Sequence, residues 1–459
     1  MEKGSEDSGP PQPVGFWDPR LKHVRLEAMR KWVYTTVVLM AFILSVLSIY
    51  WAVFFHLPAN LSSLVIYIVD FDGQVAPYDN IGHTPIVGPA LVQLGQQMVS
   101  QGDTLAFGSL PPSDFNNDPL QVRQAVYDER AWGAIIINPN ATALLYQAVE
   151  TGNSSYDPMG ACQWVYEDSR DDTNYYDFIL PIVNMYLQQA VAMVGEQWAS
   201  IALENATDPT ALANLRAAPQ AISPAIGFSE YNLRPLYPYT TIPAVNTTDL
   251  IILSFFSFSF YLPIHMKYLK PEGHPPLKFW QLIIWRWSAT IVAYLFLSLA
   301  YSLISLAFQI NFFGPSNIPD VIPSQISHGN TPAYGHGTFP VYWMINYVGM
   351  MALGLACENV AMLVGQPWTG LWLIFWVITN VSTAFYDIDI EPHFYYWGYA
   401  WPLHHVVMGS RTILFDIKSE IGLNFGVLFA WVAVNTALFP LACYWMRYKN
   451  NHGLHEYWA

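Results

Sequence analysis

The sequence predicts a polytopic α-helical membrane protein with six transmembrane spans and an exterior α/β domain between the first and second spans. Of the 459 residues, 53% are hydrophobic and only 12% are charged, which is typical of membrane proteins and not of soluble globules. Several apolar stretches contain the ~20 residues needed to cross ~30 Å of hydrocarbon. One long polar region carries a cluster of glycosylation sequons and separates the first apolar stretch from the others.

The charged residues are segregated along the chain and predict its orientation. Residues 1–31 are expected to form a cytoplasmic tail, because basic residues cluster there next to the first apolar stretch. Residues 16–31 are either a helix on the membrane surface or a solvated basic flank. Residues 58–249 contain no Lys and many acids, as expected for the exterior side. A basic stripe that could bind nucleic acid is absent.

The spans follow from the apolar stretches and the charges that flank them. Residues 32–56 form the first span, which starts too late and is too long for a cleaved signal peptide and is therefore predicted to be a signal anchor. Residues 249–446 form a membrane domain, and residues 447–459 form a second cytoplasmic tail. The five spans of this domain are expected at Asp249–Met266, Phe279–Phe308, Val341–Val364, Trp368–Tyr386 and Ile421–Met446.

Residues 57–248 are predicted to be a glycosylated α/β domain in the lumen of the secretory pathway or outside the cell. Five sequons in one region between spans are strong evidence for that side: Asn60, Asn140, Asn153, Asn205 and Asn246. Strand and helix patterns alternate, which indicates a central sheet. The strands are expected at Leu64–Val69, Leu105–Phe107, Gly133–Ile137 and Cys162–Tyr166, and the helices at Ile86–Ser100, Gln121–Asp128, Ala141–Val149 and Tyr175–Leu203.

Two acids, Asp70 and Asp72, follow the first strand of this domain. They could act as an acid and a base. In an Asp-Phe-Asp-Gly turn at the end of a strand, the simpler role is to accept hydrogen bonds from the turn.

Several sequence blocks resemble the fungal nitrosoguanidine-resistance membrane protein family. The resemblance extends from about Phe16 to Lys449, and the blocks are Val69-Asp-Phe-Asp-Gly73, Tyr231-Asn-Leu-Arg-Pro235, Trp376-Val-Ile-Thr-Asn-Val381, Tyr396-Trp-Gly-Tyr-Ala-Trp-Pro402, Ser410-Arg-Thr-Ile-Leu-Phe415 and Gly422-Leu-Asn-Phe-Gly426. That family is similar in layout to bacterial phage-infection-protein homologues and to ABC-2-type permeases. The resemblance implies a role in resistance to toxic compounds, in export or in lipid organisation, and it supplies no catalytic residue.

Glu358 lies in the expected span Val341–Val364. An ionisable side chain in a span costs at least ~2.5 kcal/mol and usually faces the interior of the bundle. Glu358 could couple protons or contact a substrate, it could form a structural hydrogen bond through Asn380 or Asn435, or it could lie at the level of the lipid headgroups. Arg286 is expected to extend its side chain to the nearby cytoplasmic surface.

Residues 387–418 form a polar and aromatic insert between the last two expected spans. The insert is expected to be a re-entrant or interfacial hairpin, or to line a cavity in which His404 and His405 handle protons or substrate. A metal site is the third alternative, but the spacing matches no metal motif, and no metal or cofactor is predicted. The acids and histidines concerned are Asp387, Asp389, Glu391, His393, His404 and His405.

The sequence predicts export of, or resistance to, small toxic or amphipathic compounds, with Glu358, Asn380, Asn435, His404 and His405 as candidate residues of the pathway. The chain has neither a phosphate-binding Gly-rich loop nor a Gly-x-Ser-x-Gly elbow, so neither P-loop ATP hydrolysis nor a hydrolase is indicated. We expect no enzymatic activity, and a membrane enzyme that uses the acids and histidines of residues 387–418 is the least favoured alternative. An ABC-2-like permease would need a separate ATPase, and its partners would be membrane lipids, the substrate and a second copy of the chain. The alternative is a scaffold that transports nothing and regulates lipid asymmetry or another transporter.

Overall fold

The computed structural model describes residues 13–55, 57–80, 82–206, 208–269, 273–315, 318–323, 329–365 and 367–452. The chain divides into two compact units, Met1–Ala52 and Val53–Ala459. Each unit is described by itself.

The described part of the first unit is mainly one long helix. Helix α1 (Lys22–Phe42) continues through a π-helical turn at Ile43–Leu47 into α2 (Ser48–Val53). Asp18 caps the 3₁₀ turn Pro19–Leu21 that precedes α1, by accepting a hydrogen bond from the Arg20 backbone N–H at 2.8 Å. Of the two alternatives for residues 16–31, a separate surface helix does not fit, because the basic residues from Lys22 onward belong to the same continuous helix.

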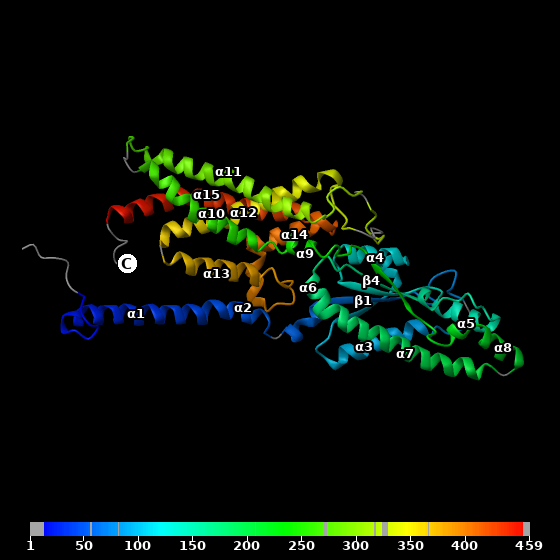
Figure 1. Ribbon diagram of the computed structural model, residues 1–459. Coiled ribbons are helices and arrows are strands. Elements are labelled where there is room, and N and C mark those ends of the chain that lie inside the picture. Colours follow the sequence, from blue (N-terminus) through cyan, green and yellow to red (C-terminus); the bar gives the residue numbers. More distant parts are fainter. Residues whose placement is uncertain are drawn as a thin grey trace, which may run out of the picture. The chain divides into compact units, whose positions relative to one another are not determined.

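The second unit contains a five-stranded sheet with the order β2-β1-β3-β4-β5. Strand β1 pairs in parallel with β2 and β3, β3 pairs antiparallel with β4, and β4 pairs in parallel with β5. The strands are β1 (Val65–Asp70), β2 (Ala106–Leu110), β3 (Gly133–Ile137), β4 (Cys162–Tyr166) and β5 (Phe228–Asn232). The four expected strands are confirmed, and β5 is an additional strand that brings the chain back toward the membrane helices (Figure 1).

Helices cover both faces of the sheet, as the alternation of the sequence predicts. Helices α3 (Val87–Gln101) and α7 (Leu180–Glu204) lie side by side on one face, and α4 (Pro119–Tyr127) covers the other (Figure 1). The Tyr186 hydroxyl of α7 donates to the Leu91 carbonyl of α3 at 2.7 Å. Helices α5 (Ala141–Thr151) and α8 (Pro209–Ala217) pack against each other and complete the α/β domain.

Asp72 joins the starts of two helices at the C-terminal end of β1. Its carboxylate accepts hydrogen bonds from the Thr142 N–H at 2.9 Å and from the Gly88 N–H at 3.3 Å. Gly88 must lack a side chain, because a Cβ there would lie 1.9 Å from the Asp70 carboxylate. Burial raises the pKa of Asp70 to about 6. The geometry is that of a structural cap, in keeping with the hydrogen-bonding role of this turn.

Four long helices form the bundle at the other end of the unit: α10 (Asp249–Met266), α11 (Phe279–Ala307), α12 (Thr338–Val364) and α15 (Ile421–Asn451). Helix α12 lies in the centre and packs against the other three (Figure 1). The short helix α9 (Thr241–Val245) connects the α/β domain to α10. We call the end of the bundle next to the α/β domain the domain end, and the opposite end the far end.

The described part of the chain contains six helices that are long and apolar enough to span a membrane. Five of them lie at expected spans, and the sixth does not. The helix at the expected span Trp368–Tyr386 is shorter than predicted, because α13 (Thr369–Ser382) has 14 residues, or about 21 Å of helix. Tyr386 instead belongs to a loop, and its hydroxyl donates to Asp177 of the α/β domain at 3.0 Å. Conversely, the helical stretch Asp172–Glu204 reaches the required length, but its α7 part packs against α3 of the α/β domain.

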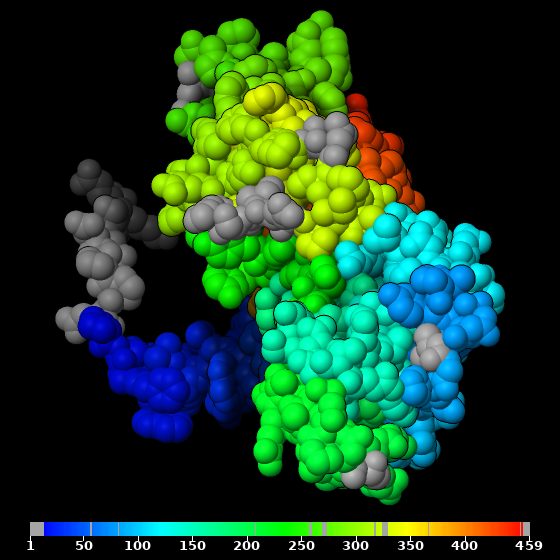
Figure 2. Space-filling view, turned by 90° about the vertical axis from the view of Figure 1, so that its right-hand side faces the viewer, coloured from blue at the N-terminus to red at the C-terminus, as the bar shows by residue number. Residues whose placement is uncertain are grey.

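The insert 387–418 folds into a 3₁₀ turn at His393–Ala400 followed by α14 (Pro402–Phe415). Helix α14 packs against α12, α15 and α9, and nearly all its residues are buried. It lies between the bundle and the sheet (Figure 1). Figure 2 looks onto the domain end, where the α/β domain adjoins the segment that follows α11.

Candidate functional site

A line of buried polar side chains runs along one face of α11. The residues recur every three or four positions, which places them on one face of a helix. The first and the last of these residues are 19 positions apart, so they span about 29 Å of helix, which is close to the thickness of the hydrocarbon core. The α11 residues are Arg286, Thr290, Tyr294, Ser298, Ser302 and Ser305. We call these residues the polar seam, together with Tyr342, Asn346 and Glu358 on the facing side of α12.

The far end of the seam is a buried ion pair. Arg286 Nη2 donates to Glu358 Oε1 at 2.6 Å, and the Thr290 hydroxyl donates to Glu358 Oε2 at 3.3 Å. Arg286 Nη1 points to the sulfur atoms of Met362 and Cys443. Arg286 is only 1% exposed, so the expectation that its side chain reaches the surface is wrong. The carboxylate in α12 stabilises the guanidinium inside the bundle instead.

The middle of the seam is tightly packed. The Tyr294 hydroxyl donates to the Ser254 carbonyl of α10 at 3.3 Å. A Cβ at Gly354 would lie 2.3 Å from the Tyr294 hydroxyl oxygen, so this glycine allows α12 to approach α10 and α11 closely. Trp343 Nε1 donates to the Ser298 hydroxyl at 3.2 Å.

The domain end of the seam is a chain of hydrogen bonds. Asn346 Nδ2 donates to the Ser302 hydroxyl at 3.1 Å, and the Ser305 and Tyr342 hydroxyls are 3.2 Å apart. The Tyr342 hydroxyl also donates to the Ala244 carbonyl of α9 at 2.9 Å. The buried Asn346 Oδ1 accepts no hydrogen bond from any residue that the structure describes. It is a free acceptor inside the seam.

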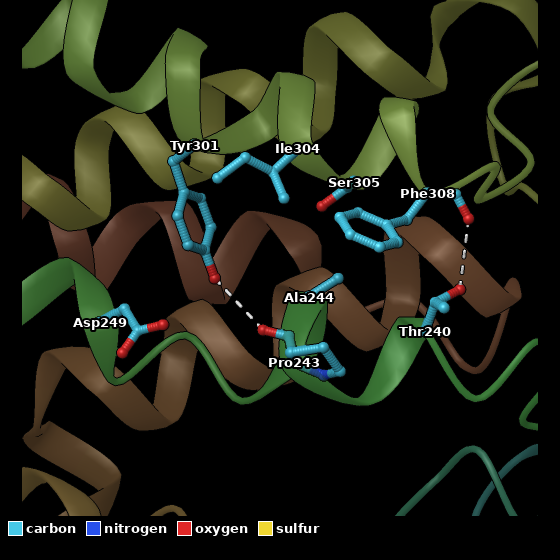
Figure 3. A pocket seen from close by; sticks show the side chains of 8 residues that line it. All are labelled: Thr240, Pro243, Ala244, Asp249, Tyr301, Ile304, Ser305 and Phe308. Atoms are coloured by element: carbon cyan, nitrogen blue, oxygen red, sulfur yellow. Dashed lines mark hydrogen bonds between the residues drawn. The ribbon is translucent and has the colours of Figure 1, made fainter.

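A pocket of about 240 Å³ opens at this end (Figure 3). Tyr301 and Thr240 tie its two walls together, because the Tyr301 hydroxyl donates to the Pro243 carbonyl at 3.2 Å and the Thr240 hydroxyl donates to the Phe308 carbonyl at 3.5 Å. Ser305 belongs both to the pocket and to the seam. The pocket is lined by Thr240, Pro243, Ala244, Asp249, Tyr301, Ile304, Ser305 and Phe308.

The predicted residues Asn380 and Asn435 lie outside the seam. Asn435 accepts a hydrogen bond from Asn359 Nδ2 at 3.2 Å and thereby joins α15 to α12. Asn380 accepts one from the Leu403 N–H at 3.1 Å and joins α13 to the start of α14. Neither contacts Glu358, whose partners are Arg286 and Thr290.

The two histidines of α14 bond to backbone and amide groups. His404 Nδ1 lies 3.3 Å from the Thr383 carbonyl, and burial lowers the pKa of His404 to about 4. His405 Nδ1 lies 2.9 Å from Asn424 Oδ1, and its Nε2 lies 2.8 Å from the Tyr399 carbonyl. Among the described residues, no three His, Cys, Asp or Glu side chains are grouped as a metal site.

A second set of buried charges joins α14 to the α/β domain, and we call it the junction cluster. Arg411 Nη1 donates to Asp171 Oδ2 at 2.8 Å, and Nη2 donates to Asp172 Oδ1 at 2.9 Å. Arg234, which follows β5, donates to the Asp416 carbonyl at the end of α14 at 3.0 Å. These contacts connect segments that are about 180 to 240 residues apart in the sequence.

Glu391 lies in the loop beside the junction cluster. It is 2% exposed, and neither carboxyl oxygen has a hydrogen-bond partner among the described residues. Burial, with the charges of Asp387 and Asp171 as further causes, raises the pKa of Glu391 to about 9. Glu391 is therefore protonated at neutral pH.

The five sequons differ in exposure. Asn153, Asn205 and Asn246 are exposed, whereas Asn60 and Asn140 are half-buried. Asn60 Nδ2, the atom that would carry the glycan, donates to the Ile390 carbonyl at 3.0 Å.

Reasoning from the sequence found Glu358 but missed the seam to which it belongs. The signal was present: polar residues recur every four positions in the span Phe279–Phe308. The junction cluster left no such signal, because its partners come from distant segments.

Comparison with known proteins identifies a family and relatives that include a yeast membrane protein. The family described as "Protein of unknown function (DUF3533)" matches residues 35–437. An uncharacterized endoplasmic reticulum membrane protein of Saccharomyces cerevisiae is 28% identical, over 96% of this chain and 85% of its own length. No solved structure matches.

Proposed function

The chain belongs to the DUF3533 family, and we propose that this integral membrane protein moves small amphipathic compounds across its membrane. The polar seam is the observation that carries the proposal. It extends over a membrane thickness, it begins at a buried ion pair, and it ends at a pocket.

The physical cost of the seam supports a functional role. An ionisable residue in a span costs at least ~2.5 kcal/mol on insertion scales, and such residues mark substrate and ion pathways. Hydrophobic side chains of similar volume would join α11 and α12 without this cost. Seam hydroxyls and the Asn346 oxygen could replace the water around a polar group as it passes between the two helices.

The orientation and location belong to the same proposal. We place the α/β domain on the luminal or exterior side, since it carries the five sequons, and both termini in the cytoplasm. The yeast relative is described as an endoplasmic reticulum membrane protein, which supports a membrane of the secretory pathway. The resemblance to ABC-2-type permeases adds a homodimer and a separate ATPase, and the likeness to nitrosoguanidine-resistance proteins adds a role in resistance to toxic compounds.

The test is flux of a fluorescent amphipathic compound into proteoliposomes, measured with and without a proton gradient. We expect flux with the wild type and its loss in Glu358→Gln. The double variant Arg286→Met/Glu358→Met is the matched control, because replacing both partners leaves no unpaired buried charge. If this variant is folded and has lost flux, the pair is needed for movement. Wild-type flux in the double variant, or no flux from folded wild type, would contradict the proposal.

A scaffold without transport is the second candidate function. The close packing at Gly354 favours it, since α10, α11 and α12 leave no room there for even one added methyl group. A scaffold predicts that the Arg286→Met/Glu358→Met variant keeps its cellular role and that deletion of the α/β domain abolishes it.

A further inference from the structure

We propose that the pocket at the domain end of the seam binds an amphipathic organic cation. The charged head would pair with Asp249, and the apolar tail would lie along Ile304 and Phe308. This proposal rests on the proposed function, because it names the class of substrate that would enter the seam.

The walls of the pocket fit an apolar tail. Ile304 and Phe308 are 56% and 63% exposed in the folded chain, so their side chains are available to a ligand. The hydrogen bonds of Tyr301 and Thr240 hold α11 against the segment before α10, so the two walls are already in place (Figure 3). A preformed apolar pocket with few polar groups is the usual form of a small-molecule site.

The charge of the pocket selects a cation. Asp249 is the one charged residue among the eight described lining residues. Its carboxylate lies at the start of α10 and is directed toward the space beside Tyr301 (Figure 3). The aromatic ring of Tyr301 adds a second attraction for an ammonium group, through cation–π contact.

The net negative charge of the α/β domain also favours a cation. Residues 57–248 contain 19 Asp and Glu, five Arg and no Lys, so they hold nearly all of the chain's net charge of −15. A surface with this excess raises the local concentration of cations and lowers that of anions.

The floor of the pocket leads into the seam. Ser305 and Ala244 line the pocket, and both contact the Tyr342 hydroxyl. A ligand bound here would lie next to the first hydrogen bonds that must open for movement along α11.

The test is equilibrium binding to the full chain in nanodiscs. Two probes share a dansyl group on an undecyl chain and differ only in the head, which is trimethylammonium in one and carboxylate in the other. We expect saturable binding of the cationic probe and at least tenfold weaker binding of the anionic one. Asp249→Asn should weaken binding of the cationic probe at least fivefold. Ile304→Trp should abolish the saturable binding of this probe, because the larger side chain fills the pocket.

Glu196→Gln is the matched control, because it removes one negative charge from an exposed position of α7, far along the chain from the pocket residues. It should bind like the wild type, and the thermal midpoint of each variant reports whether it is folded. Equal binding of both probes, or unchanged binding in folded Asp249→Asn, would overturn the inference. Binding as expected without flux in proteoliposomes would support the inference and contradict the proposed function. Flux together with equal binding of the two probes would support the proposed function and contradict the inference.

Discussion

The chain buries arginine beside carboxylates in two places, and the two places differ. In the bundle, Arg286 faces one carboxylate, that of Glu358, and its other contacts are sulfur atoms. In the junction cluster, Arg411 binds Asp171, Asp172 and the Arg170 carbonyl. The first site balances one charge against one, whereas the second gathers two acids around one guanidinium. We infer that the junction cluster holds the unit together and that the Arg286–Glu358 pair is the site that can rearrange during transport.

The largest loss of stability should follow Arg411→Ala. This change leaves the buried Asp171 and the partly buried Asp172 without their cation, and breaking a buried pair typically costs about 3–5 kcal/mol. The thermal midpoint of the detergent-solubilised protein, followed by tryptophan fluorescence, measures it. The triple variant Arg411→Ala/Asp171→Asn/Asp172→Asn should recover much of the loss. An unchanged midpoint in Arg411→Ala would show that the cluster does not join the bundle to the α/β domain.

Arg286→Met alone should cost somewhat less, because it leaves one unpaired acid instead of two. A lone carboxyl group in a span costs ~2.5–3.5 kcal/mol on insertion scales. The Arg286→Met/Glu358→Met double variant should return to the wild-type midpoint or exceed it. A double variant less stable than the single one would mean that the pair is structural, and the contrast with the junction cluster would disappear.

Gly354→Ala tests the packing between the bundle helices. The added Cβ would lie 2.3 Å from the Tyr294 hydroxyl oxygen and 2.7 Å from Ser254 Cβ. Such overpacking costs about 1–3 kcal/mol. Gly426→Ala in α15 is the control, since nothing lies within 4 Å of its added Cβ. Equal midpoints for the two variants would contradict the tight packing of the seam.

The most gradual effect is the pH dependence due to Glu391, because it is spread over several pH units. Burial raises the pKa of this carboxyl from 4.5 to about 9, so the folded chain holds a proton that the unfolded chain releases in this range. Stability should therefore fall as pH rises from 4.5 to 9, by at most about 1.4 kcal/mol per pH unit for one group.

Midpoints of the wild type and Glu391→Gln between pH 5 and pH 9 measure this effect. The midpoint of Glu391→Gln should fall less with rising pH than that of the wild type. The midpoint of Asp389→Asn, which changes an exposed carboxyl in the same loop, should fall as much as that of the wild type. A decline of the same size in Glu391→Gln would show that Glu391 is ionised in the folded chain.

Local patterns predicted the α/β domain well. The strands at Gly133–Ile137 and Cys162–Tyr166 begin and end where the apolar runs predict. Strand β5 was missed because Phe228–Asn232 contains Ser, Glu and Asn and lies at the edge of the sheet, where the pattern is weak. The helix expected at Trp368–Tyr386 was predicted too long, because the aromatic residues of the loop that follows it were counted as helical.

The candidate site was predictable only in part. Glu358 is conspicuous because an acid in an apolar stretch is rare, but its partner lies 72 residues earlier on another helix. Asn380 and Asn435 were expected beside it because they are polar residues in apolar stretches. The packing of the bundle decides which of them meet, and a sequence pattern does not contain that information.

The most direct test of the account asks whether water enters the seam during flux. Ser298→Cys places a thiol in the seam and Phe296→Cys places one on the exposed face of α11, in a background where the buried Cys162, Cys357 and Cys443 are replaced by Ala. The reagent is a charged, membrane-impermeant methanethiosulfonate, added to proteoliposomes while an amphipathic compound is moving. The account predicts that Ser298→Cys reacts faster during flux than at rest and that Phe296→Cys does not. Flux without any reaction at Ser298→Cys would contradict a pathway through the polar seam.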